Sequence, residues 1–224
     1  GAYIALAGVG ATAAAVTVES GSLAKLLSAC VFPAGLSMVI LAGSELFTGN
    51  CLMVMALLER RITPAQLLRN WLTVYLGNAV GGAAVAALAV YSHTASLFGD
   101  GLARSMVSIA ESKAALGAGD AFLRGVLCNF LVCLAVWMAA ASKRAEGKVI
   151  ALFFPILLFV LCGYEHCIAN LYYLPAGAFA AAEYGMETTL TLAGCLKNLT
   201  AVTLGNLVGG AALGVGYRFA YLKE

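Results

Sequence analysis

A single histidine lies inside an apolar part of the chain, within residues 163–170 (GYEHCIAN). Imidazole exchanges protons near neutral pH more readily than any other unperturbed side chain. His166 could therefore act as a titratable group on a path for small ions, or as a structural residue that is hydrogen-bonded between helices. We favour the functional role, because ionisable side chains in apolar segments are costly and often mark substrate or proton pathways.

A second polar cluster, residues 43–50 (GSELFTGN), matches the first one at a constant offset along the chain. The matching pairs are Gly43 and Gly163, Glu45 and Glu165, and Asn50 and Asn170. Two acidic groups beside a path for anions would repel the permeant species. We therefore predict a structural role for both carboxylates, as acceptors of hydrogen bonds from backbone amides that are freed where helices break.

Three further polar residues are candidates for contact with a small ion. Thr48 lies in residues 43–50, and its hydroxyl could face the same central axis as His166 or bond to the backbone. Asn129 interrupts an apolar run and could line a path or clasp two helices. Lys113 precedes the fourth apolar segment, where it could be a solvated loop lysine or a fixed charge that raises the local concentration of anions.

The composition predicts that these residues belong to a membrane protein. Apolar residue types make up 62% of the 224 residues and charged types only 11%, whereas soluble domains are about half apolar and a quarter charged. The formal net charge of +2 gives no reason to expect a nucleic-acid partner. The seven cysteines form no CxxC pair and no Cys/His cluster, so we expect buried thiols and neither a metal site nor a cofactor.

Six apolar segments can be drawn along the chain, at about residues 1–18, 23–58, 69–92, 120–141, 149–182 and 197–220. A helix of about 20 residues crosses a bilayer, so the second and fifth segments are too long for one straight span. Each of them holds one of the two polar clusters near its middle, and Pro175 follows the second cluster. We predict that both segments are broken helices that line a cavity.

The third and sixth segments also match, because residues 76–84 (LGNAVGGAA) are similar to residues 204–212 (LGNLVGGAA). Asn70 and Asn198 recur at the same spacing before them. A repeat of three helices enters the membrane from opposite sides in its two copies. We therefore expect an all-α integral membrane fold with six transmembrane segments in two inverted three-helix repeats. The single transmembrane domain would cover residues 1–224, with repeats at about residues 1–105 and 106–224.

The basic residues predict the orientation in the membrane. One side would carry Arg60, Arg61, Arg69, Lys143, Arg144, Lys148, Arg218 and Lys223. The other side would carry Lys25, Arg104, Lys113, Arg124 and Lys197. The excess on the first side places the loops after segments two and four in the cytoplasm, together with both termini.

Several segments resemble the formate/nitrite transporter family. Residues 46–50 (LFTGN) and 163–175 (GYEHCIANLYYLP) are similar to its signature segments, and residues 129–137 (NFLVCLAVW) and 203–210 (TLGNLVGG) to its fourth and sixth helices. The resemblance covers essentially the whole chain. It implies an aquaporin-like six-helix protomer, a homopentamer with one pore in each protomer, and passage of small monovalent anions across a bacterial inner membrane.

The resemblance also implies roles for individual residues. His166 and Thr48 match the central pore residues of the family, Asn129 the asparagine near them, and Lys113 a lysine in the vestibule. The matches to its two apolar constrictions are Phe32, Leu36, Leu46, Phe47 and Phe159, joined by Val132. Family members handle formate, nitrite, lactate or hydrosulfide, and we favour the hydrosulfide-channel branch. The N-terminal segment that the family uses for gating would precede Gly1.

The implied mechanism has two forms. Lys113 would gather the anion, after which hydrogen bonds from the central polar residues would replace part of its lost hydration between the apolar constrictions. Either the bare anion crosses the membrane, or a proton from the region of His166 crosses with it.

Two other function classes remain as alternatives. An aquaporin-like pore for neutral solutes would be expected to carry paired Asn-Pro-Ala boxes and a filter arginine, which the sequence lacks. A membrane-embedded enzyme is less favoured, because no Walker, HExxH, GxSxG or dinucleotide motif occurs in its required context. We therefore expect a protein that is not an enzyme.

Overall fold

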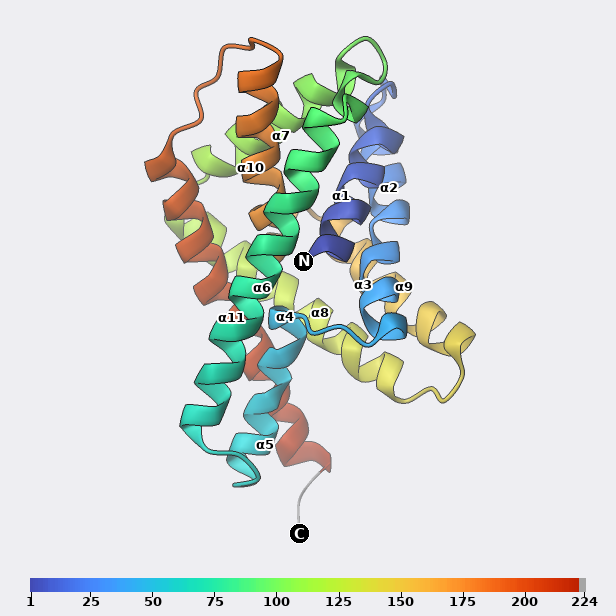
Figure 1. The fold of residues 1–224 in the computed structure, drawn as a ribbon. Helices are drawn as coiled ribbons and strands as arrows, with labels where there is room; N and C mark the ends of the chain where they lie inside the picture. The colour runs from blue at the N-terminus through green and yellow to red at the C-terminus, as the bar shows by residue number, and fades with distance from the viewer. Residues whose placement is uncertain (222–224) are drawn as a thin grey trace.

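The computed structural model describes residues 1–221, and every regular element in that range is a helix (Figure 1). The α-helices are α1 (Ala2–Ala15), α2 (Gly21–Val31), α3 (Pro33–Ala42), α4 (Phe47–Asn50), α5 (Val54–Leu58), α6 (Pro64–Tyr91), α7 (Gly101–Ala115), α8 (Ala118–Ala140), α9 (Ala145–Leu161), α10 (Cys167–Glu183) and α11 (Leu192–Tyr221). Two 3-10 turns are also present, η1 (Cys51–Met53) and η2 (Thr94–Ser96).

Four helical stretches are long and apolar enough to cross a membrane: the α2–α3 unit (Gly21–Ala42), α6, α8 and α11. Helix α1 and the α4–α5 unit (Phe47–Leu58) are shorter apolar helices. The fifth apolar segment of the sequence is divided between α9 and α10, which have 17 residues each. These helices give the chain the character of a multi-pass membrane protein.

Both long apolar segments are interrupted at a glycine with left-handed backbone. Helix α3 ends at Gly43, with φ of 73°, and α9 is followed by Gly163, with φ of 69°. Glycine adopts positive φ without the steric cost of a Cβ atom. Leu46 and His166 are extended, and α4 and α10 begin directly after them. In Figure 1 the chain descends through α2–α5 and rises through α9–α10, so it passes the two breaks in opposite directions.

Helices α8 and α11 approach each other closely through glycines. A Cβ atom on Gly205 would lie 2.2 Å from the carbonyl oxygen of Phe122, and one on Gly209 would lie 2.1 Å from that of Val126. Small residues allow this approach between helix backbones in membrane proteins. The contact brings the Asn129 side chain of α8 to the backbone of Asn206 in α11, where Nδ2 donates a hydrogen bond at 2.7 Å.

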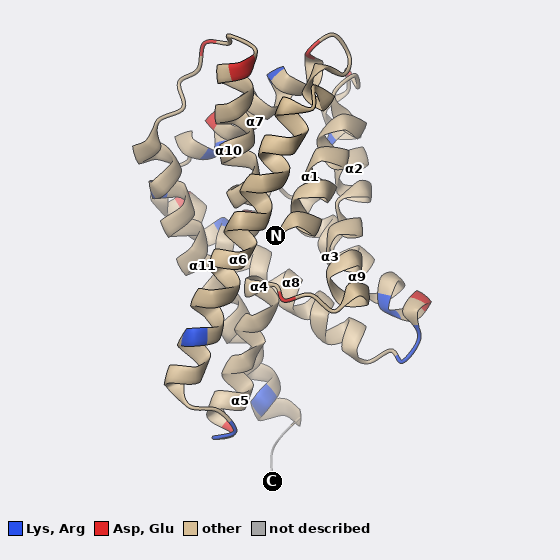
Figure 2. Ribbon diagram, in the orientation of Figure 1, with Lys and Arg blue, Asp and Glu red and all other residues tan. Residues whose placement is uncertain are grey.

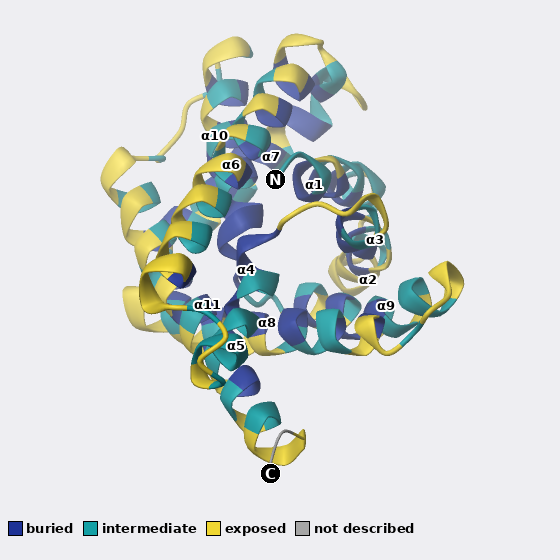
Figure 3. Ribbon diagram, turned by 60° about the horizontal axis from the view of Figure 1, so that its bottom comes forward, coloured by how far each residue is buried: buried dark blue, intermediate teal, exposed yellow. Residues whose placement is uncertain are grey.

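The surface suits a hydrocarbon environment. Large apolar side chains are exposed along one face of α6, at Leu68, Leu72, Leu76 and Val80. Figure 2 shows most charged residues near helix ends and in loops, and Figure 3 shows the buried residues on the faces that helices turn toward one another. Hydrocarbon can cover the apolar outer faces, while the polar clusters lie between helices.

Candidate functional site

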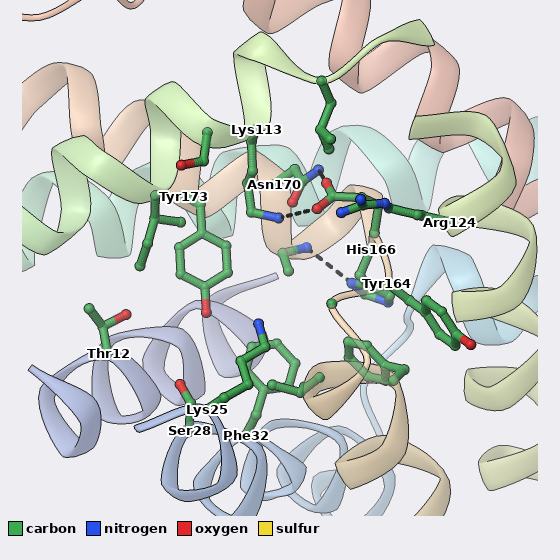
Figure 4. A pocket seen from close by; sticks show the side chains of 18 of the residues that line it. Thr12, Lys25, Ser28, Phe32, Lys113, Arg124, Tyr164, His166, Asn170 and Tyr173 are labelled. Carbon is green, nitrogen blue, oxygen red and sulfur yellow. Dashed lines mark hydrogen bonds and ion pairs between the residues drawn. The ribbon is translucent and has the colours of Figure 1, made fainter. Parts of the chain in front are cut away.

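A cavity of about 360 Å³ opens between α1, α2, α7, α9 and α10 and reaches the second helix break. We call it the vestibule (Figure 4). Its charged and polar lining includes Lys25, Lys113, Arg124, Glu165, His166 and Tyr173. The four residues of the break, from Gly163 to His166, all contribute to it. The break therefore presents the side chains of Tyr164, Glu165 and His166 to a space that is large enough for a small ion.

The inner end of the vestibule meets a narrow apolar space at His166. This second cavity measures only about 10 Å³, and we call it the constriction. Its lining is Ile4, Phe32, Leu36, Leu46, Val132, Ile156, Phe159 and His166. Phe32 and Phe159 meet edge to face, with ring centroids 5.6 Å apart. His166 is the polar member of this lining and also lines the vestibule, so it lies where the polar cavity meets the apolar one.

Phe47 is the one predicted constriction residue that lies outside both cavities. Its ring packs against Tyr75 and Trp71 of α6, at centroid distances of 5.0 and 6.4 Å. Successive side chains of extended backbone point in opposite directions. Leu46, the extended residue before it, lines the constriction, so the Phe47 side chain turns away toward α6.

Both ring nitrogens of His166 are hydrogen-bonded, and the ring is buried. Nδ1 accepts from the backbone N–H of Ala169 at 3.1 Å and thereby caps α10. A neutral imidazole with an acceptor at Nδ1 carries its proton on Nε2. Nε2 lies 2.9 Å from the hydroxyl of Thr48, which is fully buried. The two helix breaks thus meet through a hydrogen bond that His166 donates to Thr48.

Asn129 binds the backbone of Thr48 and lines neither cavity. Its amide donates to the carbonyl oxygens of Thr48, at 3.2 Å, and of Asn206, at 2.7 Å. The Cys133 thiol also donates to the Thr48 carbonyl, at 3.2 Å. All of these groups are buried. Asn129 therefore holds the backbone of the first break in place, which corresponds to the interhelical role that the sequence left open.

Two asparagines from the repeated helices α6 and α11 bind the freed backbone at the breaks. Asn78 accepts from the N–H of Phe47 at 3.1 Å and donates to the carbonyl of Glu45 at 3.1 Å. Asn206 accepts from the N–H of Cys167 at 2.9 Å and donates to the carbonyl of Glu165 at 2.9 Å. A further bond joins Asn206 to the carbonyl of Gly125 at 2.8 Å.

The expectation that the carboxylates of Glu45 and Glu165 bind freed backbone amides is therefore wrong. The Glu165 carboxylate accepts instead from the Lys113 ammonium at 2.9 Å and from the Asn170 amide at 2.7 Å. The Glu45 carboxylate accepts from the Asn50 amide. An asparagine can both donate and accept, which lets Asn78 and Asn206 satisfy an N–H and a carbonyl at once, whereas a carboxylate only accepts.

Lys113 is not a free charge at the vestibule wall. Its side chain is 15% exposed, and its ammonium is ion-paired with Glu165 and lies 5.4 Å from the centroid of the Tyr173 ring. Figure 4 shows Lys25 on the wall facing Lys113, and Arg124 reaching in from α8. Sequence reasoning missed both. The available signal was that each is a basic residue within or beside an apolar segment.

Within residues 1–221 no group of three or more His, Cys, Asp or Glu side chains could hold a metal ion. The seven cysteines are free thiols. Four of them, at positions 51, 128, 133 and 167, are buried, whereas Cys30 and Cys162 are exposed and Cys195 is intermediate, so the expectation of buried thiols is confirmed only in part. The described lining of the vestibule supplies fixed charges and hydrogen-bonding side chains.

The sequence matches the family described as "Formate/nitrite transporter" over residues 1–220. A "Probable formate transporter" of Methanothermobacter thermautotrophicus is 39% identical, over 100% of this chain and 86% of that protein. The "Formate channel FocA" of Haemophilus influenzae is also 39% identical, over 98% of this chain and 83% of that protein.

Solved structures agree with the sequence matches. One described as an "FNT family ion channel" has a TM-score of 0.88 and 33% identity, over 98% of this chain and 86% of that one. A "Pentameric formate channel with formate bound" has a TM-score of 0.87 and 31% identity, over 99% of this chain and 93% of that one.

Proposed function

The chain belongs to the formate/nitrite transporter family, and on that premise we propose that it is a channel for small monovalent anions of weak acids. Formate is the first candidate, because the similar proteins are named for it; nitrite and hydrosulfide are the others. The observation that carries the proposal is the position of His166, at the junction of the vestibule and the constriction.

The proposed architecture is one transmembrane domain of six spans, built as two inverted repeats at about residues 1–105 and 106–224. The hydrogen bonds of the two breaks support it. Asn78 with residues 45 and 47 makes the same pair of bonds as Asn206 with residues 165 and 167. We further propose a homopentamer with an aquaporin-like pore in each protomer, since a similar solved structure is described as pentameric.

Passage would begin in the vestibule, where basic side chains raise the local concentration of anions. The anion then loses water as it nears the constriction, and an apolar slit offers no hydrogen bonds in return. The N–H of His166, shared with Thr48, is the donor closest to that step. Asn129 acts by fixing Thr48 and does not touch the ion.

The proton could cross with the anion or stay behind. Because Nδ1 of His166 caps α10, a second proton on the ring would cost that bond. His166 therefore suits the role of a hydrogen-bond donor to the anion better than that of a group that is charged in its resting state. In proton-coupled passage, the Nε2 proton of His166 would be transferred to the anion, and a proton from the vestibule would replace it.

We place the protein in a bacterial inner membrane with both termini in the cytoplasm. The support is the excess of basic residues in the loops after α5 and α8 and near the C-terminus. Cleavage of a C-terminal tag in sealed inside-out vesicles, compared with right-side-out vesicles, tests this orientation.

The decisive experiment measures uptake of formate, nitrite and hydrosulfide in parallel into liposomes that hold equal amounts of protein. We expect His166→Phe to abolish uptake, because an apolar plug leaves the dehydrated ion no donor. His93→Asn is the matched control, since His93 is exposed, has φ of 59°, and asparagine tolerates that backbone. Uptake of glycerol without anions would indicate a neutral-solute pore, and substrate turnover in detergent would indicate an enzyme.

A further inference from the structure

The charged residues that line the vestibule are not equivalent. Lys113 and Glu165 form an ion pair at 2.9 Å, and both side chains are largely buried. Such a pair has no net charge, so its effect on a third ion falls off faster with distance than that of a single charge. Lys25 and Arg124 line the same cavity, are exposed, and form no ion pair within residues 1–221. The net charge of the vestibule lining therefore comes from Lys25 and Arg124.

Lys25 belongs to a wall of the vestibule that carries no carboxylate. This wall is formed by α1 and α2, and neither helix contributes an acidic residue to the lining. Figure 4 shows the Lys25 ammonium pointing into the cavity, toward the side on which Tyr173 and His166 lie. Arg124 comes from α8, where its carbonyl accepts from the N–H of Glu165 at 3.3 Å. Arg124 is therefore adjacent to the acidic residue of the lining, whereas Lys25 lies on the other wall.

One face of α2 connects Lys25 with the constriction. Lys25, Ser28 and Phe32 are spaced by three and four residues, which places them on the same side of the helix. Phe32 lines both the vestibule and the constriction. The seven residues from Lys25 to Phe32 correspond to about 10 Å along a helix. An anion that is held by Lys25 therefore lies about two helical turns from the apolar space, in the part of the path where it can still be hydrated.

A wider cavity of about 570 Å³ borders the vestibule, and we call it the outer cavity. It includes residues 15–17 at the end of α1, and Arg104 is a charged member of its lining. Four residues line both cavities: Thr12, Ser28, Ser108 and Ile109. Ser28 lies one helical turn from Lys25. An anion that enters through the outer cavity therefore reaches the vestibule beside Lys25.

We infer that Lys25 is the residue that captures the anion in the vestibule, whereas Lys113 and Glu165 form a neutral pair that holds the second helix break. The inference rests on the proposed function and deepens it, since it assigns an anion-binding residue to the same pore. It differs from the role that the resemblance implied for Lys113. An ammonium group offers three N–H donors, so Lys25 can bind a small anion that keeps part of its hydration shell.

The size of the effect follows from Coulomb's law. One unit charge about 5 Å away in water changes the local concentration of a monovalent anion by about fourfold. In dilute salt, Lys25→Gln should therefore raise the formate concentration that gives half-maximal uptake by about fourfold, and Lys25→Glu by about sixteenfold. Lys25→Arg keeps the charge and should stay close to the wild type. These shifts should largely disappear at about 1 M salt, where the screening length is near 3 Å.

The test measures initial rates of formate uptake into liposomes over a range of formate concentrations, per amount of folded protein. A protease-cleavable C-terminal tag reports the orientation of each variant. Lys197→Gln is the matched control, because Lys197 is exposed and lines neither the vestibule nor the constriction. The double variant Lys113→Gln, Glu165→Gln removes the ion pair without changing the net charge of the lining. It should shift the half-maximal concentration less than Lys25→Gln does.

Three results would overturn the inference while the pore itself stands. They are an unchanged half-maximal concentration in Lys25→Gln, an equal shift in Lys197→Gln, and a larger shift in the double variant than in Lys25→Gln. A shift in Lys25→Gln that persists at about 1 M salt, or that Lys25→Arg shares, would also overturn it, because the role of Lys25 would then not be electrostatic. Absence of uptake of all three anions by the wild type would instead refute the proposed function.

Discussion

Nε2 of His166 lies 2.9 Å from the hydroxyl oxygen of Thr48, and this hydrogen bond joins two helix breaks that are 118 residues apart in the chain. His166 comes from the break before α10 and Thr48 from the first turn of α4. Neither break contains both residues, so this hydrogen bond forms only when the two helix breaks are packed against each other.

Replacing Thr48 tests that contact. Thr48→Val removes the hydroxyl and leaves the buried N–H of His166 without an acceptor, at a cost of about 1–3 kcal/mol. We expect lower thermal stability and formate uptake reduced at least tenfold, whereas Thr48→Ser should retain most of both. Uptake by Thr48→Val at the wild-type rate would show that the hydroxyl has no part in passage.

Asn206 should be more important for stability than Asn78. Asn206→Ala leaves three buried backbone groups without their partner, those of Cys167, Glu165 and Gly125. Asn78→Ala leaves two, and one of them belongs to the exposed residue Glu45. Hydrogen bonds inside membranes contribute about 0.6 kcal/mol each on average, so Asn206→Ala, which loses one more bond, should melt about 1–2 °C below Asn78→Ala. Equal melting temperatures would contradict this ranking.

The pair of Lys113 and Glu165 should show strong coupling. Their side chains are 15% and 6% exposed, and removing one partner of a buried pair typically costs about 3–5 kcal/mol. We expect Lys113→Gln to be much less stable than the Lys113→Gln, Glu165→Gln double variant in detergent unfolding.

A surface ion pair provides the control for that coupling. Arg144 and Glu146 are 84% and 68% exposed and 3.7 Å apart, and exposed pairs contribute about 0–1 kcal/mol. The same double-variant cycle at this pair should give almost no coupling. Coupling of similar size at both pairs would mean that the Lys113 pair is effectively solvated.

Two glycines of α11 should respond in opposite ways to alanine. A Cβ atom on Gly209 would collide with the carbonyl of Val126, whereas nothing lies within 4 Å of one on Gly216. Gly209→Ala should lower stability by about 1–3 kcal/mol through overpacking, while Gly216→Ala should raise it by up to about 1 kcal/mol through helix propensity. Melting curves in the same detergent compare them directly.

The loop before α11 should loosen in acid. The Thr189 N–H and the Thr188 hydroxyl donate to Glu111 of α7, and these bonds, the backbone one first, lower the pKa of the Glu111 carboxyl. A lowered pKa means that the carboxylate stabilises the loop above the ordinary value of about 4.3, and that this contribution is lost as pH falls through the lowered pKa.

Amide hydrogen exchange around Thr189 measures this effect. After correction for the intrinsic rate, exchange should be slow at pH 6 and faster at about pH 3, below the ordinary carboxyl pKa. In Glu111→Gln the exchange should be fast at both pH values. Glu187→Gln changes an exposed carboxylate in the same loop, and its exchange should follow that of the wild type. Protection that is independent of pH would contradict the role given to Glu111.

The helix breaks could be predicted from the sequence because their signals are local. Gly43 and Gly163 interrupt apolar runs that are too long for one span, and both adopt the positive φ that glycine permits. The alternation of extended backbone was also a local signal. Once Leu46 is assigned to the lining of the path, this alternation predicts that the side chain of Phe47 points away from the path.

The partners of the polar groups could not be predicted, because they are set by packing between distant helices. Cys167 and its cap Asn206 are 39 residues apart, and Lys113 and Glu165 are 52 apart. The sequence showed that Asn78 and Asn206 recur, but this recurrence predicted only an inverted repeat of helices and no partner for either side chain. Which of two polar side chains binds a freed amide depends on the approach of α6 and α11, which no spacing reveals.

The two networks also differ in when they can form during synthesis. The bonds among Glu45, Phe47, Asn50, Asn70 and Asn78 lie within 34 residues of chain, so the nascent first half can close them before the second half is made. The second network needs Asn206, near the C-terminus, for α10 to be capped. A ribosome that stalls before that residue would leave α10 in the translocon with its first amide unpaired, as a substrate for membrane quality control.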